Sequence, residues 1–253
     1  PREGDGYLAP MTLNLIVVNV DVPAALKSLE RGGSRRLLEK ARAKYPLLPE
    51  SILPTTFPLK NSLTINHTGT RLRGVLDGSQ PEEITEAERY GRRQALQIVR
   101  ALREFGGPPF AAAQLAATGP QVGVRETRRI RGVYALTEAD AKSGRRFDDA
   151  IAWRSGKIDV GGGGTDYDMK IHHVPYRAIL PAKLDGLLVG GRCISATHIG
   201  AAAGKSMGNC MATGHAAGVA AAMAAAKARL PRELDVREVQ RVLAQHDVDL
   251  ARA

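Results

Sequence analysis

The sequence predicts a mixed α/β or α+β fold, because segments with strand and helix patterns alternate along it. Residues 11–22 are dense in Leu, Ile and Val, as in a sheet strand. Residues 85–105 repeat small and apolar side chains at steps of three and four, which is the spacing of one buried helix face. Residues 187–189 form a short apolar run typical of a buried strand, and a helix rich in alanine and glycine follows it.

In the N-terminal half, we expect the first strand to lead into one helix over residues 23–45 and then into a proline-punctuated loop. Residues 63–67 predict a second strand. The long helix carries Thr85 and Glu88 at the spacing of a capping box, which predicts its start. A solvated helix face is expected for the arginines outside the buried stripe: Arg89, Arg92, Arg93, Arg100 and Arg103.

In the C-terminal half, residues 121–133 have a strand pattern although they include several arginines. Thr137 and Asp140 predict a short capped helix, and residues 161–164 are four glycines that predict a flexible loop. Asp235 predicts the N-cap of a last helix.

The composition is basic and poor in aromatic residues. The 253 residues carry a formal net charge of +10, and aromatic residues make up 4% of them. A basic surface suits an anionic partner, whereas few aromatics disfavour nucleic-acid binding by base stacking. A generally arginine-rich composition is the simpler interpretation, so we expect no nucleic-acid partner.

Cysteine and histidine content indicates neither a metal site nor an extracellular protein. Cys193 and Cys210 are too few for an iron–sulfur cluster or a disulfide framework, and the histidines are scattered. No signal peptide begins the chain, and the uncharged stretch over residues 206–226 has the alanine and glycine content of a buried helix. We therefore expect a cytoplasmic protein without membrane contact. The start at Pro1 predicts a fragment of a longer gene product.

Two common nucleotide-binding motifs are not matched. Residues 200–206 place three residues between glycines where a phosphate loop needs four. No Gly-x-Gly-x-x-Gly follows a predicted strand, so the usual pyrophosphate cradle is not encoded in these residues.

The turn at Gly190 and Gly191 and the later helix form the most informative pattern. A glycine turn followed by a helix start with small side chains brings backbone N–H groups and a positive dipole end to an anion or an electron-rich ring. Gly214 and Gly218 lie on one face of that helix. Close helix packing and room for a cofactor both explain this pair.

Arg125 and Arg129 would share one face of a strand. A buried arginine needs a partner, because an unpaired buried charge is costly. Ion pairs with Glu126, Asp148 or Asp149 would satisfy these arginines, and so would an anionic group of a substrate or cofactor.

A family resemblance is carried by short segments in sequence order. They are residues 2–6 with 10–12, 66–70, 85–93, 147–151 and 174–177, together with GVRETRRI at 123–130, LLVGGRCISATH at 187–198 and CMATGHAAG at 210–218. In this order they resemble the FAD-dependent oxidoreductase family, which includes heterodisulfide reductase A-like proteins. The resemblance implies an FAD-binding sheet-and-helix domain into which a mixed-sheet substrate domain is inserted. Carried onto this chain, residues 1–150 would be the inserted domain and residues 151–253 the C-terminal part of the FAD-binding domain.

The resemblance also implies the residues that contact FAD. The turn would approach the ribityl and pyrophosphate groups, and the helix start would lie beneath the isoalloxazine ring. In this chain the turn is Gly190, Gly191, Arg192 and Cys193, and the helix start is Thr213, Gly214, His215, Ala216 and Ala217. His215, in the first turn, would either donate a hydrogen bond to the reduced flavin or point away from it.

The implied function is flavin-mediated redox chemistry on a small-molecule substrate, with no catalytic residue assigned. Candidates for substrate contact are His67, Arg125, Arg129, Tyr176 and Arg177. The alternative is a non-catalytic basic module that binds an acidic partner. Because the pyrophosphate cradle is missing, we expect this chain alone to bind FAD weakly and to be inactive without an N-terminal FAD-binding half.

Overall fold

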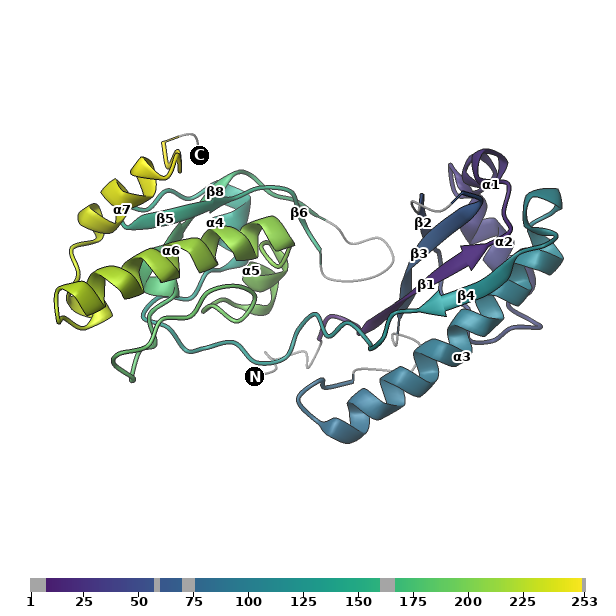
Figure 1. Cartoon of the computed structure of the whole chain (residues 1–253), viewed down its shortest axis with the longest axis horizontal. Helices are drawn as coiled ribbons and strands as arrows, with labels where there is room; N and C mark the ends of the chain where they lie inside the picture. Colours follow the sequence, from purple (N-terminus) through teal and green to yellow (C-terminus); the bar gives the residue numbers. More distant parts are fainter. Residues whose placement is uncertain (1–7, 57–59, 70–75, 160–166, 252–253) are drawn as a thin grey trace. The chain divides into compact units, whose positions relative to one another are not determined.

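The computed structural model describes residues 8–56, 60–69, 76–159 and 167–251, and it divides into two compact units. The N-terminal unit is built on Tyr7–Thr127, and the C-terminal unit on Arg128–Gly161 and Thr165–Ala253 (Figure 1). The functional boundary that the resemblance implies after residue 150 stays a prediction. Residues 128–150 belong to the C-terminal unit, where the Ile130 N–H donates to the Cys193 carbonyl at 2.9 Å. Both units combine helices with antiparallel strands, which confirms the mixed α/β class.

The N-terminal unit contains a four-stranded antiparallel sheet with the order β2-β3-β1-β4. Its strands are β1 (Thr12–Val18), β2 (Leu53–Thr56), β3 (Ser62–Gly69) and β4 (Gln114–Thr118). The strands predicted within residues 11–22 and at 63–67 are confirmed, whereas β2 forms where a loop was expected. Residues 121–133 form no regular strand, and Gly123 makes an isolated bridge with Thr12 in this unit.

Helix α3 (Pro81–Phe105) packs along this sheet (Figure 1). The predicted stripe is buried from Ala87 to Leu102, whereas its last member, Phe105, is 37% exposed. Gly91 allows a close approach, because a Cβ there would lie 3.0 Å from the Cβ of Leu13. The helix begins at Pro81 rather than at Thr85, since proline suits the first helical turn. The Thr85 hydroxyl therefore donates to the Pro81 carbonyl at 2.9 Å, and the predicted capping box is wrong.

Residues 23–45 form two helices rather than one. Helices α1 (Val22–Leu29) and α2 (Gly33–Ala41) are separated where Arg31 and Gly32 adopt left-handed backbone angles, with φ of 47° and 81°. Such angles end a helix, and glycine adopts them without strain. Together with α3, η2 (Pro108–Phe110) and the sheet, these helices enclose the first hydrophobic core.

In the C-terminal unit, a two-stranded antiparallel sheet is covered by helices. Strand β5 (Ala150–Arg154) pairs with β8 (His172–Pro175), and helix α6 (Met207–Ala226) packs against β5 (Figure 1). The remaining elements are α4 (Glu138–Ser143), β6 (Lys157–Ile158), β7 (Tyr167–Asp168), η3 (Tyr176–Ala178), α5 (His198–Ala202), η4 (Pro231–Glu233) and α7 (Val236–Gln245). No described helix is long and apolar enough to cross a membrane. The predicted glycine loop at 161–164 lies outside the described residues.

Both predicted helix caps in this unit are confirmed. Thr137 caps α4 in a capping box with Asp140, and Asp235 caps α7 by accepting the Arg237 N–H at 2.9 Å. Asp140 is buried and also accepts the Tyr134 hydroxyl at 2.9 Å. Burial by itself would raise the pKa of Asp140, but hydrogen bonds from Thr137 and Tyr134 and the nearby Arg145 charge lower it overall.

Candidate functional site

The turn at Gly190 and Gly191 rests directly on helix α6. A Cβ on Gly190 would lie 2.8 Å from the Cα of Gly214 and 3.2 Å from the Thr213 carbonyl oxygen, so only glycine permits this approach. Gly191 has a φ of 90°, and its N–H donates to the Thr213 hydroxyl at 3.0 Å. The structure thus brings together residues that the resemblance assigns to one cofactor. We call Gly190, Gly191, Thr213 and Gly214 the glycine contact.

The apolar run before the turn is not a strand. Residues 187–189 join no sheet among the described residues, and the Val189 N–H makes a single backbone hydrogen bond to Ile179 at 3.0 Å. Leu187 is 43% exposed. The predicted buried strand is therefore wrong in this structure, since an apolar run forms a strand only where a neighbouring strand can pair with it.

Helix α6 begins at Met207, nearly two turns before Thr213. Ser206 occupies the N-cap with extended backbone, but its side chain caps no N–H, and the first turn holds no acidic residue. The positive end of the helix dipole therefore lies at the first turn after Ser206. The predicted helix start at Thr213 is wrong, because an alanine and glycine pattern carries no periodic signal for where the helix begins. Thr213 and Ala216 are fully buried.

His215 points away from the glycine contact, toward the end of α7. Its Nε2 forms a hydrogen bond with Nδ1 of His246 at 2.9 Å, and the two rings are parallel to within 12°. His215 also lines a cavity of about 510 Å³ together with Trp153 and Asn209. The expectation that His215 sits in the first turn is wrong, since it lies beyond the second turn of α6. His246 was not anticipated.

The two cysteines flank the glycine contact as free thiols. Cys193 and Arg192 are exposed, and the Cys193 sulfur lies 3.7 Å from the Gly190 carbonyl oxygen. Burial raises the pKa of the Cys210 thiol, although the charges of Arg154 and Arg192 oppose this shift. Cys210 is therefore a thiol near neutral pH. Ala217 is half-buried on α6.

Arg154, at the end of β5, was missed by the sequence analysis. It is 2% exposed. Its Nη1 donates to the Gly200 carbonyl at 3.3 Å, and its Nε has no hydrogen-bond partner among the described residues. The guanidinium lies against Gly204, where a Cβ would fall 2.0 Å from its central carbon. Burial lowers the pKa of Arg154 to about 10. Arg154 ends the apolar run 150–154, and nothing in that pattern indicates that its charged side chain is buried.

Two of the substrate candidates, Tyr176 and Arg177, make hydrogen bonds to other residues of the C-terminal unit. The buried Tyr176 hydroxyl donates to the Pro231 carbonyl at 2.8 Å, and burial raises its pKa to about 12. Arg177 donates to both carboxylate oxygens of Asp149, at 2.9 and 3.2 Å. Both residues line a groove of about 710 Å³, in which Asp149 already neutralises Arg177.

The other two arginine candidates belong to different units and make hydrogen bonds within them. The Nε of Arg125 donates to the Pro10 carbonyl at 3.1 Å within the N-terminal unit. The Nε of Arg129 donates to the Ala196 carbonyl at 2.9 Å within the C-terminal unit. The predicted shared strand face is therefore not formed. His67 belongs to β3 by its backbone, and its side chain lies outside the described residues.

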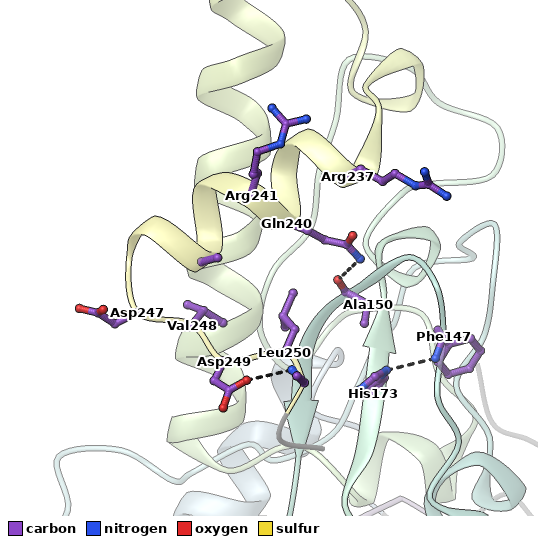
Figure 2. A pocket seen from close by; sticks show the side chains of 12 residues that line it. Phe147, Ala150, His173, Arg237, Gln240, Arg241, Asp247, Val248, Asp249 and Leu250 are labelled. Atoms are coloured by element: carbon purple, nitrogen blue, oxygen red, sulfur yellow. Dashed lines mark hydrogen bonds between the residues drawn. The ribbon is translucent and has the colours of Figure 1, made fainter.

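A further groove, of about 760 Å³, lies between α7 and the β5–β8 sheet (Figure 2). Gln240 donates to the Ala150 carbonyl at 2.9 Å, and the Phe147 N–H donates to Nδ1 of His173 at 3.1 Å. Burial lowers the pKa of His173, so the ring is neutral at pH 7. The polar groups named here in the groove are thus engaged in structural hydrogen bonds. Arg237 and Arg241 project outward from α7 (Figure 2).

Among the described residues, no group of three or more His, Cys, Asp or Glu side chains could hold a metal ion. In a comparison with known protein families, the model described as FAD dependent oxidoreductase matches residues 1–243, which include residues of both units. No curated protein and no solved structure matches the chain.

Proposed function

The chain belongs to the FAD dependent oxidoreductase family, which supports a flavin redox function, and on this premise we propose that the glycine contact and the start of α6 face the flavin. The order of the sequence motifs supports a place among the heterodisulfide reductase A-like proteins. The two free thiols support the cytoplasm as its compartment. The substrate is proposed to be a small molecule.

The observation that carries this proposal is the open backbone beside the glycine contact. Apart from adjacent residues and the backbone of α6 itself, no atom of the described residues lies within 4 Å of a Cβ position on Gly191, Gly208 or Gly214. A flat ligand can therefore approach the main chain there. The first N–H groups of α6 have no side-chain cap, and they leave the positive dipole end available to negative charge. These residues fit an electron-rich, anionic cofactor. Bound FAD would supply the redox chemistry, and the chain would orient it and stabilise its charge.

The proposed cofactor surface differs from the set implied by the resemblance. Gly191, Arg192, Cys193 and Gly214 present accessible groups, whereas Thr213 and Ala216 are buried. The ring of His215 is hydrogen-bonded to His246. Because the sequence encodes no dinucleotide fingerprint, we also propose that the FAD pyrophosphate is held by residues outside these 253.

The test is a comparison of two glycines on one helix. Gly214 and Gly218 both have open space at the Cβ position, so a substitution at either places no Cβ against the backbone of another segment. We expect Gly214→Leu to weaken FAD binding by roughly tenfold or more, measured by flavin fluorescence anisotropy up to millimolar protein, since the side chain would occupy the ligand's position. Gly218→Leu is the control and should bind within about twofold of the parent. Equal FAD affinity in all three proteins would refute the assignment.

A further inference from the structure

We propose that the exposed arginine face of α3 is a docking surface for an acidic helix of a protein partner. The surface consists of Arg89, Arg93, Leu96, Arg100 and Arg103, which we call the arginine row. It lies in the N-terminal unit and shares no residue with the proposed flavin surface. The proposal therefore stands or falls independently of the proposed function.

The arginine row is straight. Its members follow steps of four, three, four and three residues, which keep them on one face of an α-helix. At 1.5 Å per residue the row spans about 21 Å, close to four helical turns. All five side chains are exposed, on the side of α3 opposite the stripe that packs on the sheet. Folding of this unit therefore leaves the row presented outward.

The charges of the row are not neutralised by the described part of the chain. No carboxylate there pairs with Arg89, Arg93, Arg100 or Arg103. The neighbouring Arg92 differs, because it forms an ion pair with Glu88 and donates to the Pro120 carbonyl. Like charges three and four residues apart destabilise a helix by a few tenths of a kcal/mol per pair, that is ~0.2–0.5. An anionic partner would remove this repulsion and add charge-assisted hydrogen bonds.

Two features favour a protein helix over nucleic acid or lipid. Leu96 is 47% exposed in the middle of the row, where it offers an apolar contact that a phosphate backbone cannot use. A membrane surface would require a broad apolar face, and Leu96 alone does not provide one. Glu82 lies on the same face of α3, two turns before Arg89. It would repel a carboxylate of the partner there, and this repulsion favours one alignment of the acidic helix along α3. Carboxylates at matching helical spacing meet guanidinium groups bidentately.

The experiment uses the full chain and a synthetic helical peptide. The peptide carries glutamates at positions 1, 5, 12 and 15 and leucine at position 8, and a second peptide has the same composition in scrambled order. Binding is measured by fluorescence anisotropy in low salt. Arg93→Gln combined with Arg100→Gln tests the row, and Arg237→Gln combined with Arg241→Gln removes the same charge from exposed α7 positions.

We expect the matched peptide to bind the parent protein at least fivefold more tightly than the scrambled peptide. The α3 variant should lose roughly tenfold in affinity for the matched peptide, because it removes two exposed ion pairs that contribute up to ~1 kcal/mol each. The α7 variant should lose less than twofold, because its arginines lie outside the arginine row. Circular dichroism verifies that both variants fold. Equal binding of the two peptides, equal loss in both variants, or no binding at millimolar peptide would overturn the proposal. Tighter binding of a 20-base-pair DNA duplex with the same sensitivity to the α3 change would assign the row to nucleic acid instead.

Discussion

We predict that Gly190→Ala lowers the free energy of unfolding of the C-terminal unit, because it adds a methyl group at a crowded position. In Gly190→Ala the new Cβ would lie 2.8 Å from the Gly214 Cα, and because that atom is backbone, α6 must move. Overpacking of this kind costs about 1–3 kcal/mol, and loss of the Gly191–Thr213 hydrogen bond adds about 1 kcal/mol. Alanine also makes the unfolded chain less flexible than glycine does, and this entropic effect offsets about 0.4–1 kcal/mol of the destabilisation. The net loss is roughly 2–3 kcal/mol, or about 5–10 °C in Tm.

The assay follows the C-terminal unit alone. Trp153 is the only tryptophan of the chain, and its indole N–H donates to the Asp249 carbonyl at 3.0 Å. Urea unfolding monitored by its fluorescence therefore reports on the unit that contains the glycine contact. Gly214→Ala is the matched control, because its Cβ meets nothing within 4 Å, and removal of a helical glycine should stabilise the unit by about 0.5–1 kcal/mol. If Gly190→Ala unfolds within about 0.5 kcal/mol of the parent, the turn does not rest on α6 as described.

Two further changes probe buried polar groups of the same unit. Tyr176→Phe should cost about 1–2 kcal/mol, because the Pro231 carbonyl loses its donor. The pKa of Tyr176 is raised from 10.0 to about 12, so the stability that its neutral hydroxyl contributes is complete below pH 10 and is lost as the pH rises through 12. The difference in unfolding free energy between parent and Tyr176→Phe should therefore shrink over that interval, and a constant difference would contradict the burial of the hydroxyl. Arg154→Met should leave stability unchanged or raise it by about 1 kcal/mol, since no carboxylate in the described part of the chain pairs with the buried charge. A loss above about 2 kcal/mol in urea unfolding would show that the Gly200 hydrogen bond dominates.

Local sequence signals predicted the elements whose stabilising contacts are local. Thr137 and Asp235 cap α4 and α7 as expected, because an N-cap bonds to N–H groups only two or three residues away. The buried stripe of α3 was also predictable, since helical periodicity determines which side chains share a face.

Features that depend on distant residues were not predictable in the same way. Residues 187–189 have a strand pattern, but pairing requires a neighbouring strand that the pattern itself does not specify. Arg154 turns inward because Gly204, fifty residues later, leaves space for its guanidinium. For the candidate site, the glycines at 190 and 214 were identified from the sequence, whereas the start of α6 and the pairing of His215 with His246 depend on tertiary contacts.

The hydrogen bonds around Asp140 have a consequence for local opening of the chain. The buried carboxylate of Asp140 binds Tyr134, Thr137 and Arg145, so none of these three residues can move away without breaking a contact to Asp140. The segment 134–145 should open as one cooperative unit, and its amide protons should exchange with solvent at a common slow rate. Substitution of Asp140 by asparagine would remove the charge that joins them, and the segment would then exchange by independent local fluctuations. The short helix α4 would thereby lose the protection that its own few backbone hydrogen bonds cannot provide.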